Sequence, residues 1–256
     1  MTTPDAPFPL SSILVDVELP NPAPFSPALI DILSSLRVVL IGWYSVPEQT
    51  SPQQARDQFG EEARVALRSI AESFEETGGT VQTHVVFTPN QLDSLRRLSD
   101  EYRCNAVLIP AAMPHLKRIL VPLRGLQNAT SIVPFVADLV QDGTTDVTLF
   151  HILEENEAPE EAQETLLRPA AERMEDRDIA AGLIHREVMR ADDPAKAIVE
   201  KARDFDLVVL GETKPSVREI LFGTVSETIA RASNVPVIVV RHLEDPLPVT
   251  SAARAS

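Results

Sequence analysis

The chain is poor in cysteine and in long apolar runs. Its 256 residues include one cysteine, Cys104, so no disulfide can form within the chain. No apolar run approaches the ~18–20 residues that a membrane-spanning helix needs, and the longest ones, such as 235–240, have the length of a strand. The first ten residues contain three prolines and no positively charged segment, so we expect no signal peptide. These features predict a soluble, cytoplasmic protein without disulfides.

Positive charge is also scarce. The chain has 23 Lys and Arg against 38 Asp and Glu, a formal net charge of −15. This balance argues against binding to a nucleic-acid backbone or a membrane surface. Lysine occurs only at positions 117, 196, 201 and 214. Two explanations of this bias stay open, a high-GC genome and a salt-rich cytoplasm in which screening weakens the repulsion between carboxylates.

What the chain does contain is a repeated order of apolar strands and amphipathic helices. The 44% share of hydrophobic residues predicts a folded protein with a real core. The expected first-half elements are strands at 13–17, 38–41, 81–87 and 105–109 and helices at 26–36, 52–77 and 90–102. The expected second-half elements are strands at 119–123, 147–150, 184–189, 206–210 and 236–240 and helices at 128–141, 159–175, 193–203 and 224–233. Pro169 falls inside one of these helices, where we expect a kink or a break.

Strands that alternate with helices and are almost wholly apolar predict a parallel sheet covered on both faces, that is, a doubly wound α/β fold. The two halves end differently, because only the second has a final helix and a final strand. We expect a disordered N-terminus at 1–10, a truncated first domain at 11–114, a second domain at 115–241 and a flexible tail at 242–256.

The second half carries three segments that are similar to those of a known protein family. It has an opening Ile-Leu-Val-Pro run at 119–122, an Asp-Leu-Val-Val-Leu-Gly strand at 206–211, and a Gly-Thr-led helix that runs into Asn-Val-Pro-Val-Ile-Val-Val-Arg at 234–241. On these residues the chain resembles the universal stress protein (UspA) family, as a tandem pair over about 11–241, and its acidic composition is similar to that of haloarchaeal members. The resemblance implies two Rossmann-like domains of the adenine-nucleotide alpha hydrolase type, with strand order 3-2-1-4-5 in the second and the last strand missing from the first.

Many members of that family bind ATP, and many do not. The nucleotide-binding members have a Gly, two residues, a second Gly, nine residues, and then Gly-Ser or Gly-Thr, because glycines and a helix N-terminus let backbone N–H groups reach phosphates. Here Gly211 matches the first Gly, and Gly223 with Thr224 matches the last pair, whereas Lys214 replaces the second Gly and the spacer has eight residues. The family's Asp at the end of the first strand is replaced by Arg124 in the second half and by Glu18 in the first. The first half has no such Gly motif.

Three interpretations of this segment stay open. Gly211 and Thr224 are structural, ending a strand and capping a helix; or they bind ATP; or they bind another phosphorylated anion. Arg124, Lys214 and Arg218 are either ligand contacts or ordinary surface charges. The candidate ligand residues are Arg124, Gly211, Lys214, Arg218, Gly223, Thr224 and Val225.

Other chemistry-bearing residues give weaker signals. The five histidines are scattered, so we expect no zinc site, and no Gly-x-Ser-x-Gly elbow is present. We expect Cys104 in the core, and we read the acidic residues of 154–161 as a helix start in preference to a cation site. Trp43 and Tyr44 either border a ligand crevice or pack in the core. We therefore expect no enzyme, metal or certain cofactor, although nucleotidyl transferases share a related fold with a histidine-bearing motif that this chain lacks.

The last expected strand suggests how the chain could pair with a partner. We expect Val237, Ile238, Val239 and Val240 to form an edge strand, and exposed edges are either protected or used for pairing. The resemblance implies that this strand pairs with a second copy in a homodimer, and that the truncated first half packs on the second as an internal pseudo-dimer. The function predicted is stress-associated regulation through small-ligand or protein binding, without catalysis. The alternative is an ATP-binding protein with slow hydrolysis. Because family members also serve as regulatory tails of transporters, this chain would fill such a role in trans.

Overall fold

The computed structural model describes residues 11–47, 51–141, 143–211, 229 and 232–241. The first-half elements are β1 (Ser12–Leu19), α1 (Pro27–Leu33), β2 (Arg37–Ser45), α2 (Pro52–Glu76), β3 (Thr80–Thr88), α3 (Gln91–Glu101) and β4 (Ala106–Ile109). The second-half elements are β5 (Arg118–Pro122), α4 (Leu126–Leu139), β6 (Asp146–Leu153), α5 (Pro159–Ala162), η1 (Gln163–Leu167), α6 (Arg168–Glu175), η2 (Ala181–Leu183), β7 (Ile184–Arg190), α7 (Pro194–Ala202), β8 (Leu207–Gly211) and β9 (Val237–Val240).

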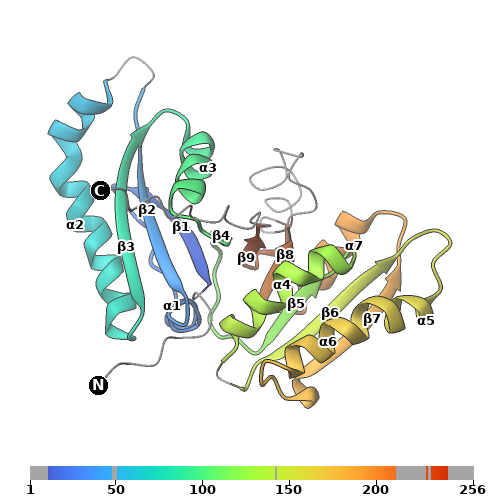
Figure 1. Cartoon of the computed structure of the whole chain (residues 1–256). Coiled ribbons are helices and arrows are strands. Elements are labelled where there is room, and N and C mark those ends of the chain that lie inside the picture. The colour runs from blue at the N-terminus through green and yellow to red at the C-terminus, as the bar shows by residue number, and fades with distance from the viewer. Residues whose placement is uncertain (1–10, 48–50, 142, 212–228, 230–231, 242–256) are drawn as a thin grey trace, which may run out of the picture.

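Within the described residues all strands belong to one sheet of nine strands, in the order β3-β2-β1-β4-β9-β8-β5-β6-β7 (Figure 1). Every neighbouring pair is parallel except β4 and β9, which are antiparallel. Counted within each half, the order is 3-2-1-4 in the first and 3-2-1-4-5 in the second. The expected α/β fold with a mostly parallel sheet is therefore confirmed.

The antiparallel seam between β4 and β9 corrects one expectation. Val237–Val240 is not an edge strand, because β9 pairs with β8 on one side and with β4 on the other. The Arg241 N–H extends the seam by donating to the Asn105 carbonyl at 2.6 Å, and its guanidinium donates to the hydroxyl of Ser99 at 2.9 Å. The first half thus uses this strand to fill the place of its missing fifth strand. A homodimer of the chain would need another surface.

Several helices begin as their sequences predict. The Asn90 side chain caps α3 by accepting from the Asp93 N–H at 3.2 Å, and Asp193 caps α7 by accepting from the Lys196 N–H at 3.1 Å. Ser26 caps α1 in the same way, with Pro27 as the first helical residue. The expected helix at 224–233 lies largely outside the described residues, as do the two expected terminal segments, 1–10 and 242–256.

The irregular helix of the second half has a physical cause in Pro169. Between α5 and α6 the five residues of η1 form a π-helical turn, and Pro169 is the second residue of α6. Proline cannot donate to a carbonyl four residues back, and its ring crowds that carbonyl, so a wider turn just before it relieves the clash. The expected kink is therefore present as a change of helix type within one continuous helical run.

Three groups of buried side chains hold the layers together. The largest lies on the sheet face covered by α1, α2, α4 and α6, and it is continuous across both halves. On the opposite face, α7 covers the second half and α3 covers the first. Successive strand residues point to opposite faces, which explains why Val237 and Val239 join one group while Ile238 and Val240 join the other.

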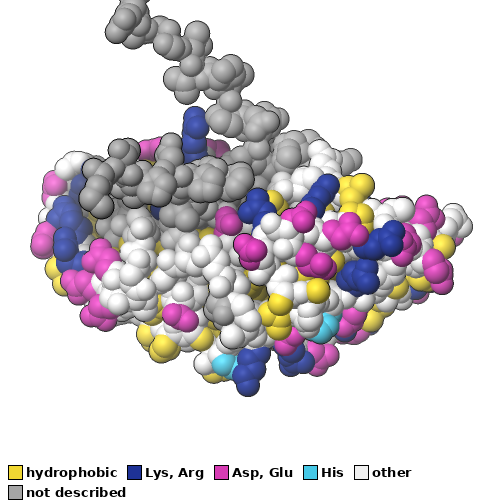
Figure 2. Space-filling view, turned by 60° about the horizontal axis from the view of Figure 1, so that its bottom comes forward, with side chains coloured by type: hydrophobic (Ala, Val, Ile, Leu, Met, Phe, Trp, Pro, Cys, Tyr) yellow, Lys and Arg dark blue, Asp and Glu magenta, His cyan; other side chains and the backbone are white. Residues whose placement is uncertain are grey.

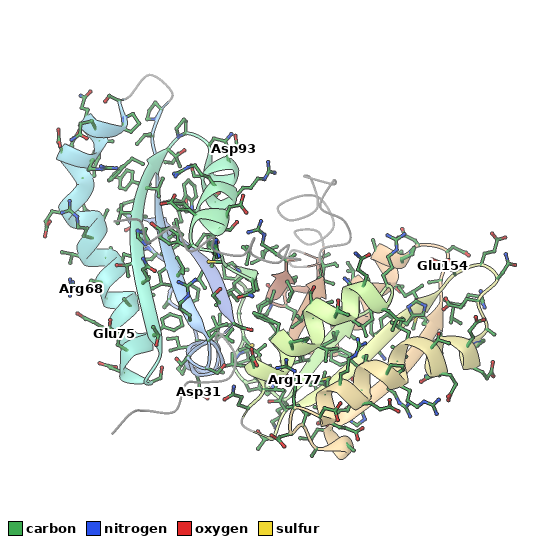
Figure 3. The ribbon with its side chains drawn as sticks, viewed as in Figure 1. Asp31, Arg68, Glu75, Asp93, Glu154 and Arg177 are labelled. Atoms are coloured by element: carbon green, nitrogen blue, oxygen red, sulfur yellow. The ribbon has the colours of Figure 1, made fainter. Side chains whose placement is uncertain are left out.

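The acidic composition is visible on the surface. Figure 2 shows Asp and Glu side chains spread over the visible face of the molecule, with Lys and Arg side chains between them. Several of these charges pair along one helix, such as Arg97 with Glu101 at 3.1 Å. Figure 3 labels Arg68 and Glu75, two exposed residues of α2, and Glu154 at the far end of the second half. Exposed pairs of this kind contribute little to stability.

Candidate functional site

A cavity of about 1010 Å³ lies where β1 and β4 end, in the first half of the chain. The strand order reverses between these two strands, because β2 and β3 follow on one side of β1 and β4 lies on the other. In open parallel sheets this reversal leaves a crevice beyond the carboxyl ends of the strands, and ligands bind there. The cavity is therefore a candidate ligand site.

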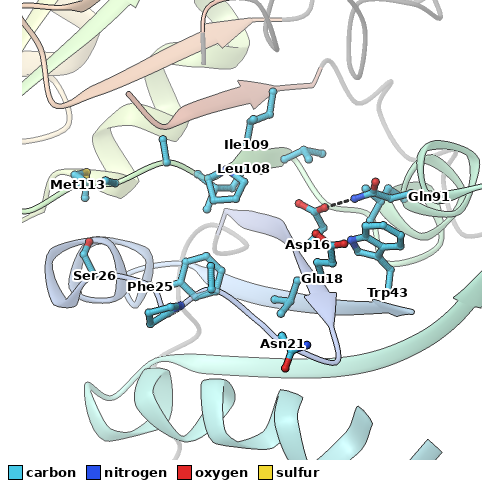
Figure 4. Close-up of a pocket in the computed structure, with 18 of the residues that line it drawn as sticks. Asp16, Glu18, Asn21, Phe25, Ser26, Trp43, Gln91, Leu108, Ile109 and Met113 are labelled. Carbon is cyan, nitrogen blue, oxygen red and sulfur yellow. Dashed lines mark hydrogen bonds between the residues drawn. The ribbon is translucent and has the colours of Figure 1, made fainter. Parts of the chain in front are cut away.

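The alternation of strand side chains decides which residues of β1 reach the cavity. Ile13, Val15 and Val17 carry the buried core on one face. Leu14 faces the other way and packs under α3, and Asp16 and Glu18 continue along that face past the end of the buried apolar group. Trp43 of β2 is the register neighbour of Glu18. Figure 4 shows Asp16, Glu18, Trp43 and Gln91 gathered at one end of the cavity.

Asp16 is the most perturbed acid in this site. Burial raises the pKa of its carboxyl and the nearby Glu18 carboxylate adds to the rise, whereas hydrogen bonds from Gln91 and from the backbone oppose it; the net result is a rise from 3.8 to about 6. The Gln91 amide donates that bond to Asp16 Oδ2 at 2.6 Å. A strongly perturbed acid in a cleft is typical of functional sites.

The opposite wall is apolar and includes the connection between the two halves. Phe25 and Ser26 come from the loop and N-cap before α1, and Leu108 and Ile109 come from β4. The next wall residues, 110–114, run from β4 toward β5 and contain the buried Met113. Figure 4 shows Phe25, Ser26 and Met113 at the far end of the cavity from Trp43. A molecule in the cavity would therefore touch the segment that joins the halves.

The structure brings two of the expected ligand residues together elsewhere. Arg124 follows β5 and Gly211 ends β8, and these two neighbouring parallel strands flank the reversal of strand order in the second half. Because β4 and β9 are antiparallel, the carboxyl ends of the second-half strands point the opposite way from those of the first half. The expected site and the cavity thus lie beyond opposite ends of the strands of this sheet.

Gly211 has a packing reason to be glycine. A Cβ at this position would lie 2.1 Å from Asn128 Nδ2 and 2.5 Å from Ile132 Cδ1, both on α4. Only a residue without a side chain lets β8 end this close to the helix. The glycine therefore does not by itself indicate a phosphate loop, and the structural interpretation accounts for it.

The remaining expected ligand residues lie outside the described residues. They are Lys214, Arg218, Gly223, Thr224 and Val225. Glu18, noted in the sequence as the first-half counterpart of Arg124, lines the cavity. Trp43 also lines the cavity, whereas Tyr44 stacks on Phe59 with ring centroids 5.0 Å apart, so the two aromatic residues have different roles.

A second polar arrangement surrounds His151, which is buried. Its Nδ1 lies 2.7 Å from the Leu123 carbonyl oxygen, which only accepts, so Nδ1 carries a proton. Its Nε2 lies 2.9 Å from Glu157 Oε2. Burial raises the pKa of Glu157, but hydrogen bonds from His151 and the Glu154 N–H, with the charges of His151 and Arg190, lower it more, and the net shift is downward. Through these two contacts, His151 of β6 joins the turn before α5 to Leu123, the residue after β5.

The other expectations have mixed outcomes. Cys104 is fully buried, and burial raises the pKa of its thiol to about 11, so it is a core residue as expected. Glu160 and Glu161 occupy the first turn of α5, in agreement with a helix start. In the part of the chain that the structure describes, no group of three or more His, Cys, Asp or Glu side chains is placed to hold a metal ion. No helix among these residues has the length and apolarity to cross a bilayer.

Sequence reasoning missed Asp16 and Gln91, and it missed the role of 110–114. A signal for Asp16 is present, because it is a charged residue inside an otherwise apolar strand. Gln91 carries no such signal. It lies 75 positions from Asp16, and only the packing of α3 on the sheet brings the two together.

Comparisons with known proteins agree with this architecture. Residues 115–241 match the model of the universal stress protein family, so the second half is a universal stress protein domain. A universal stress protein from Archaeoglobus fulgidus DSM 4304 is similar in structure with a TM-score of 0.63 and 16% identity, over 91% of this chain and 97% of its own. The cytoplasmic domain of a prokaryotic cation chloride cotransporter is similar with a TM-score of 0.51 and 14% identity, over 90% of this chain and 95% of its own.

Another solved structure is similar to only about half of the chain. A universal stress protein solved in complex with cAMP has a TM-score of 0.39 and 20% identity, over 49% of this chain and 97% of its own. Among curated protein sequences, none matches the chain. The two likenesses with TM-scores of 0.63 and 0.51 show the fold alone.

Proposed function

We propose that this protein is a non-catalytic, ligand-responsive regulator of the universal stress type. The observation that carries the proposal is the cavity in the first half, which has a perturbed acid and a tryptophan at one end and the segment 110–114 as a wall. A ligand in this cavity would contact both the strand ends and the connection to the second half. Such contact couples occupancy to the arrangement of the halves, because a ligand stabilises whichever arrangement it binds best.

We also propose that the chain is a tandem pair with a truncated first domain, divided as 11–114 and 115–241. The family model supports the second domain, and the shared element order and strand order of the halves support the first. The antiparallel pairing of β4 with β9 gives the truncated half a neighbour on its open edge. The cytoplasmic location, the absence of catalysis and binding to client proteins stay predictions of this proposal.

A second candidate function is binding of ATP or another phosphorylated anion in the second half, with slow hydrolysis as an extension. The observation that favours it is the position of Arg124 and Gly211 at the second reversal of strand order, inside the universal stress protein domain. Against it, Gly211 is already explained by its contact with Asn128 and Ile132. Titration calorimetry with millimolar ATP tests this candidate, and loss of the heat of binding in Arg124→Ala would support it.

The test of the leading proposal uses the chain's single tryptophan, Trp43, as a reporter. The full-length protein is purified, small molecules that co-purify are identified by mass spectrometry, and each is titrated while Trp43 fluorescence is recorded. A ligand of the cavity changes this fluorescence in the wild type, and Ala111→Trp, in which a bulky ring fills the cavity, should no longer bind it. That variant is read by calorimetry, since it adds a second indole. A ligand that binds both proteins equally would place the site elsewhere and overturn the proposal.

A further inference from the structure

We propose that the first-half cavity takes an organic ammonium ion, that is, a protonated or quaternary amine on a carbon frame, and not a phosphorylated ligand. This inference rests on the proposed function, since it names the ligand class of the same cavity. It follows from the distribution of charge, aromatic rings and apolar surface around the cavity.

Charge is the first argument. Among the lining residues that the structure describes, the titratable side chains are Asp16 and Glu18, and Lys, Arg and His are absent. The two acids sit at alternate positions of β1 and so face the same side, about 7 Å apart along the strand. A phosphate would meet two like charges here, whereas an ammonium group is attracted by both. Because the pKa of Asp16 is about 6, its carboxyl is ionised at neutral pH.

Aromatic and apolar surface is the second argument. Trp43 lies beside Glu18 on the neighbouring strand, and Phe25 lies across the cavity. Indole faces attract ammonium ions through the ring's negative face, more strongly when the ion is desolvated. The remaining wall, which includes Leu108, Ile109 and Met113, offers apolar surface to a carbon frame. A bare metal ion gains no binding energy from apolar contacts. In addition, the described residues hold no cluster of three metal-ligating side chains.

The hydrogen bond from Gln91 fixes the geometry of the charged end. By donating to Asp16 Oδ2 at 2.6 Å, the Gln91 amide fixes the orientation of the carboxylate at this end of the cavity. No cation among the described residues lies within ion-pair distance of Asp16 or Glu18. Among the residues that the structure describes, no cation therefore competes with a ligand for the charge of these two carboxylates.

The experiment compares probes that differ in charge alone. The full chain is titrated with 2-phenylethylammonium and with 2-phenylethanol, and with choline and its uncharged isostere 3,3-dimethylbutan-1-ol. Inorganic phosphate and AMP are the anionic probes. Trp43 fluorescence and calorimetry are recorded at physiological salt, so that weak attraction of cations to an acidic surface is screened. We expect at least one ammonium probe to bind about tenfold or more tightly than its uncharged partner.

Variants locate the effect. The double substitution Asp16→Asn with Glu18→Gln should weaken binding of the ammonium probe by about tenfold or more and leave the uncharged partner unaffected. Asp31→Asn with Glu62→Gln is the matched control, because it removes two exposed carboxylates that do not line the cavity. Equal losses in the control and the double variant would show surface attraction only and would overturn the inference.

The two proposals fail in different ways. If phosphate or AMP changes Trp43 fluorescence and the ammonium probes do not, the ligand class is wrong while a ligand-binding cavity stands. If the uncharged partners bind as well as the ammonium probes, the class is likewise wrong. If neither these probes nor any co-purifying molecule perturbs Trp43 at millimolar concentration, both the inference and the proposed function are overturned.

Discussion

The side-chain amide of Gln91 donates a 2.6 Å hydrogen bond to the carboxylate of Asp16, which joins the first residue of α3 to the second half of β1. The bond partly compensates the burial of a charged group, and it does not fully do so, because the pKa of Asp16 is still raised to about 6. A group whose ionisation is disfavoured in the folded state lowers stability wherever it is ionised.

The pH dependence of Asp16→Asn follows from this relationship. The raised pKa favours folding fully below 3.8, and that contribution is lost as the pH rises through about 6. Asn keeps the shape and the bond to Gln91 without the charge, so the variant should be more stable than the wild type at pH 7.5, by about 1–3 kcal/mol. Thermal unfolding of both proteins at pH 4.5 and pH 7.5 checks this, and a gain at pH 7.5 that persists unchanged at pH 4.5 would contradict it.

The seam between β4 and β9 predicts that both halves unfold together. Ile238 is fully buried and pairs with Leu108 of the first half and Val209 of the second. Ile238→Ala should cost about 2–5 kcal/mol, because it leaves a cavity in a core that both halves share. Urea unfolding should still show one transition, displaced to lower denaturant. Val65→Ala is the control, since Val65 is 61% exposed. Two separate transitions in the wild type would show that the seam does not couple the halves.

The contact of His151 with Glu157 predicts a loss of stability on Glu157→Gln. The substitution removes the charge that faces the buried imidazole at 2.9 Å, at a cost of about 1–3 kcal/mol near pH 7. The lowered pKa of Glu157 contributes stability above the ordinary value of 4.5 and loses that contribution as the pH falls through the folded value. The difference between variant and wild type should therefore narrow in acid. Glu155→Gln, in the same turn and exposed, should change little at either pH.

The close approach of β8 to α4 predicts that Gly211→Ala destabilises the fold whether or not any anion binds. The added methyl group would overlap Asn128 and Ile132, and overpacking of this kind costs about 1–3 kcal/mol. Ile132→Val in the same chain should recover part of the loss, because it removes the Cδ1 atom. Gly182→Ala is the matched control, since a methyl group there meets no atom within 4 Å. A Gly211→Ala protein as stable as the wild type, with weakened ATP binding, would return Gly211 to a ligand-binding role.

The sequence alone determined the class of fold, because the period of apolar residues separates strands from helices without knowledge of contacts. Capping residues such as Asn90 and Asp193 act within their own helix, so they too were readable locally. The position of Cys104 in the core follows from the same local pattern.

The tertiary structure decided what depends on distant residues. Val237–Val240 is the last strand of the chain and was expected at an edge, and only the sheet shows that β4 occupies its other side. Gly211 resembles part of a phosphate motif, and only the packing of α4 gives it another reason. The site itself was out of reach, because Asp16, Trp43, Gln91 and the segment 110–114 come together through strand order and helix packing, which no local pattern records.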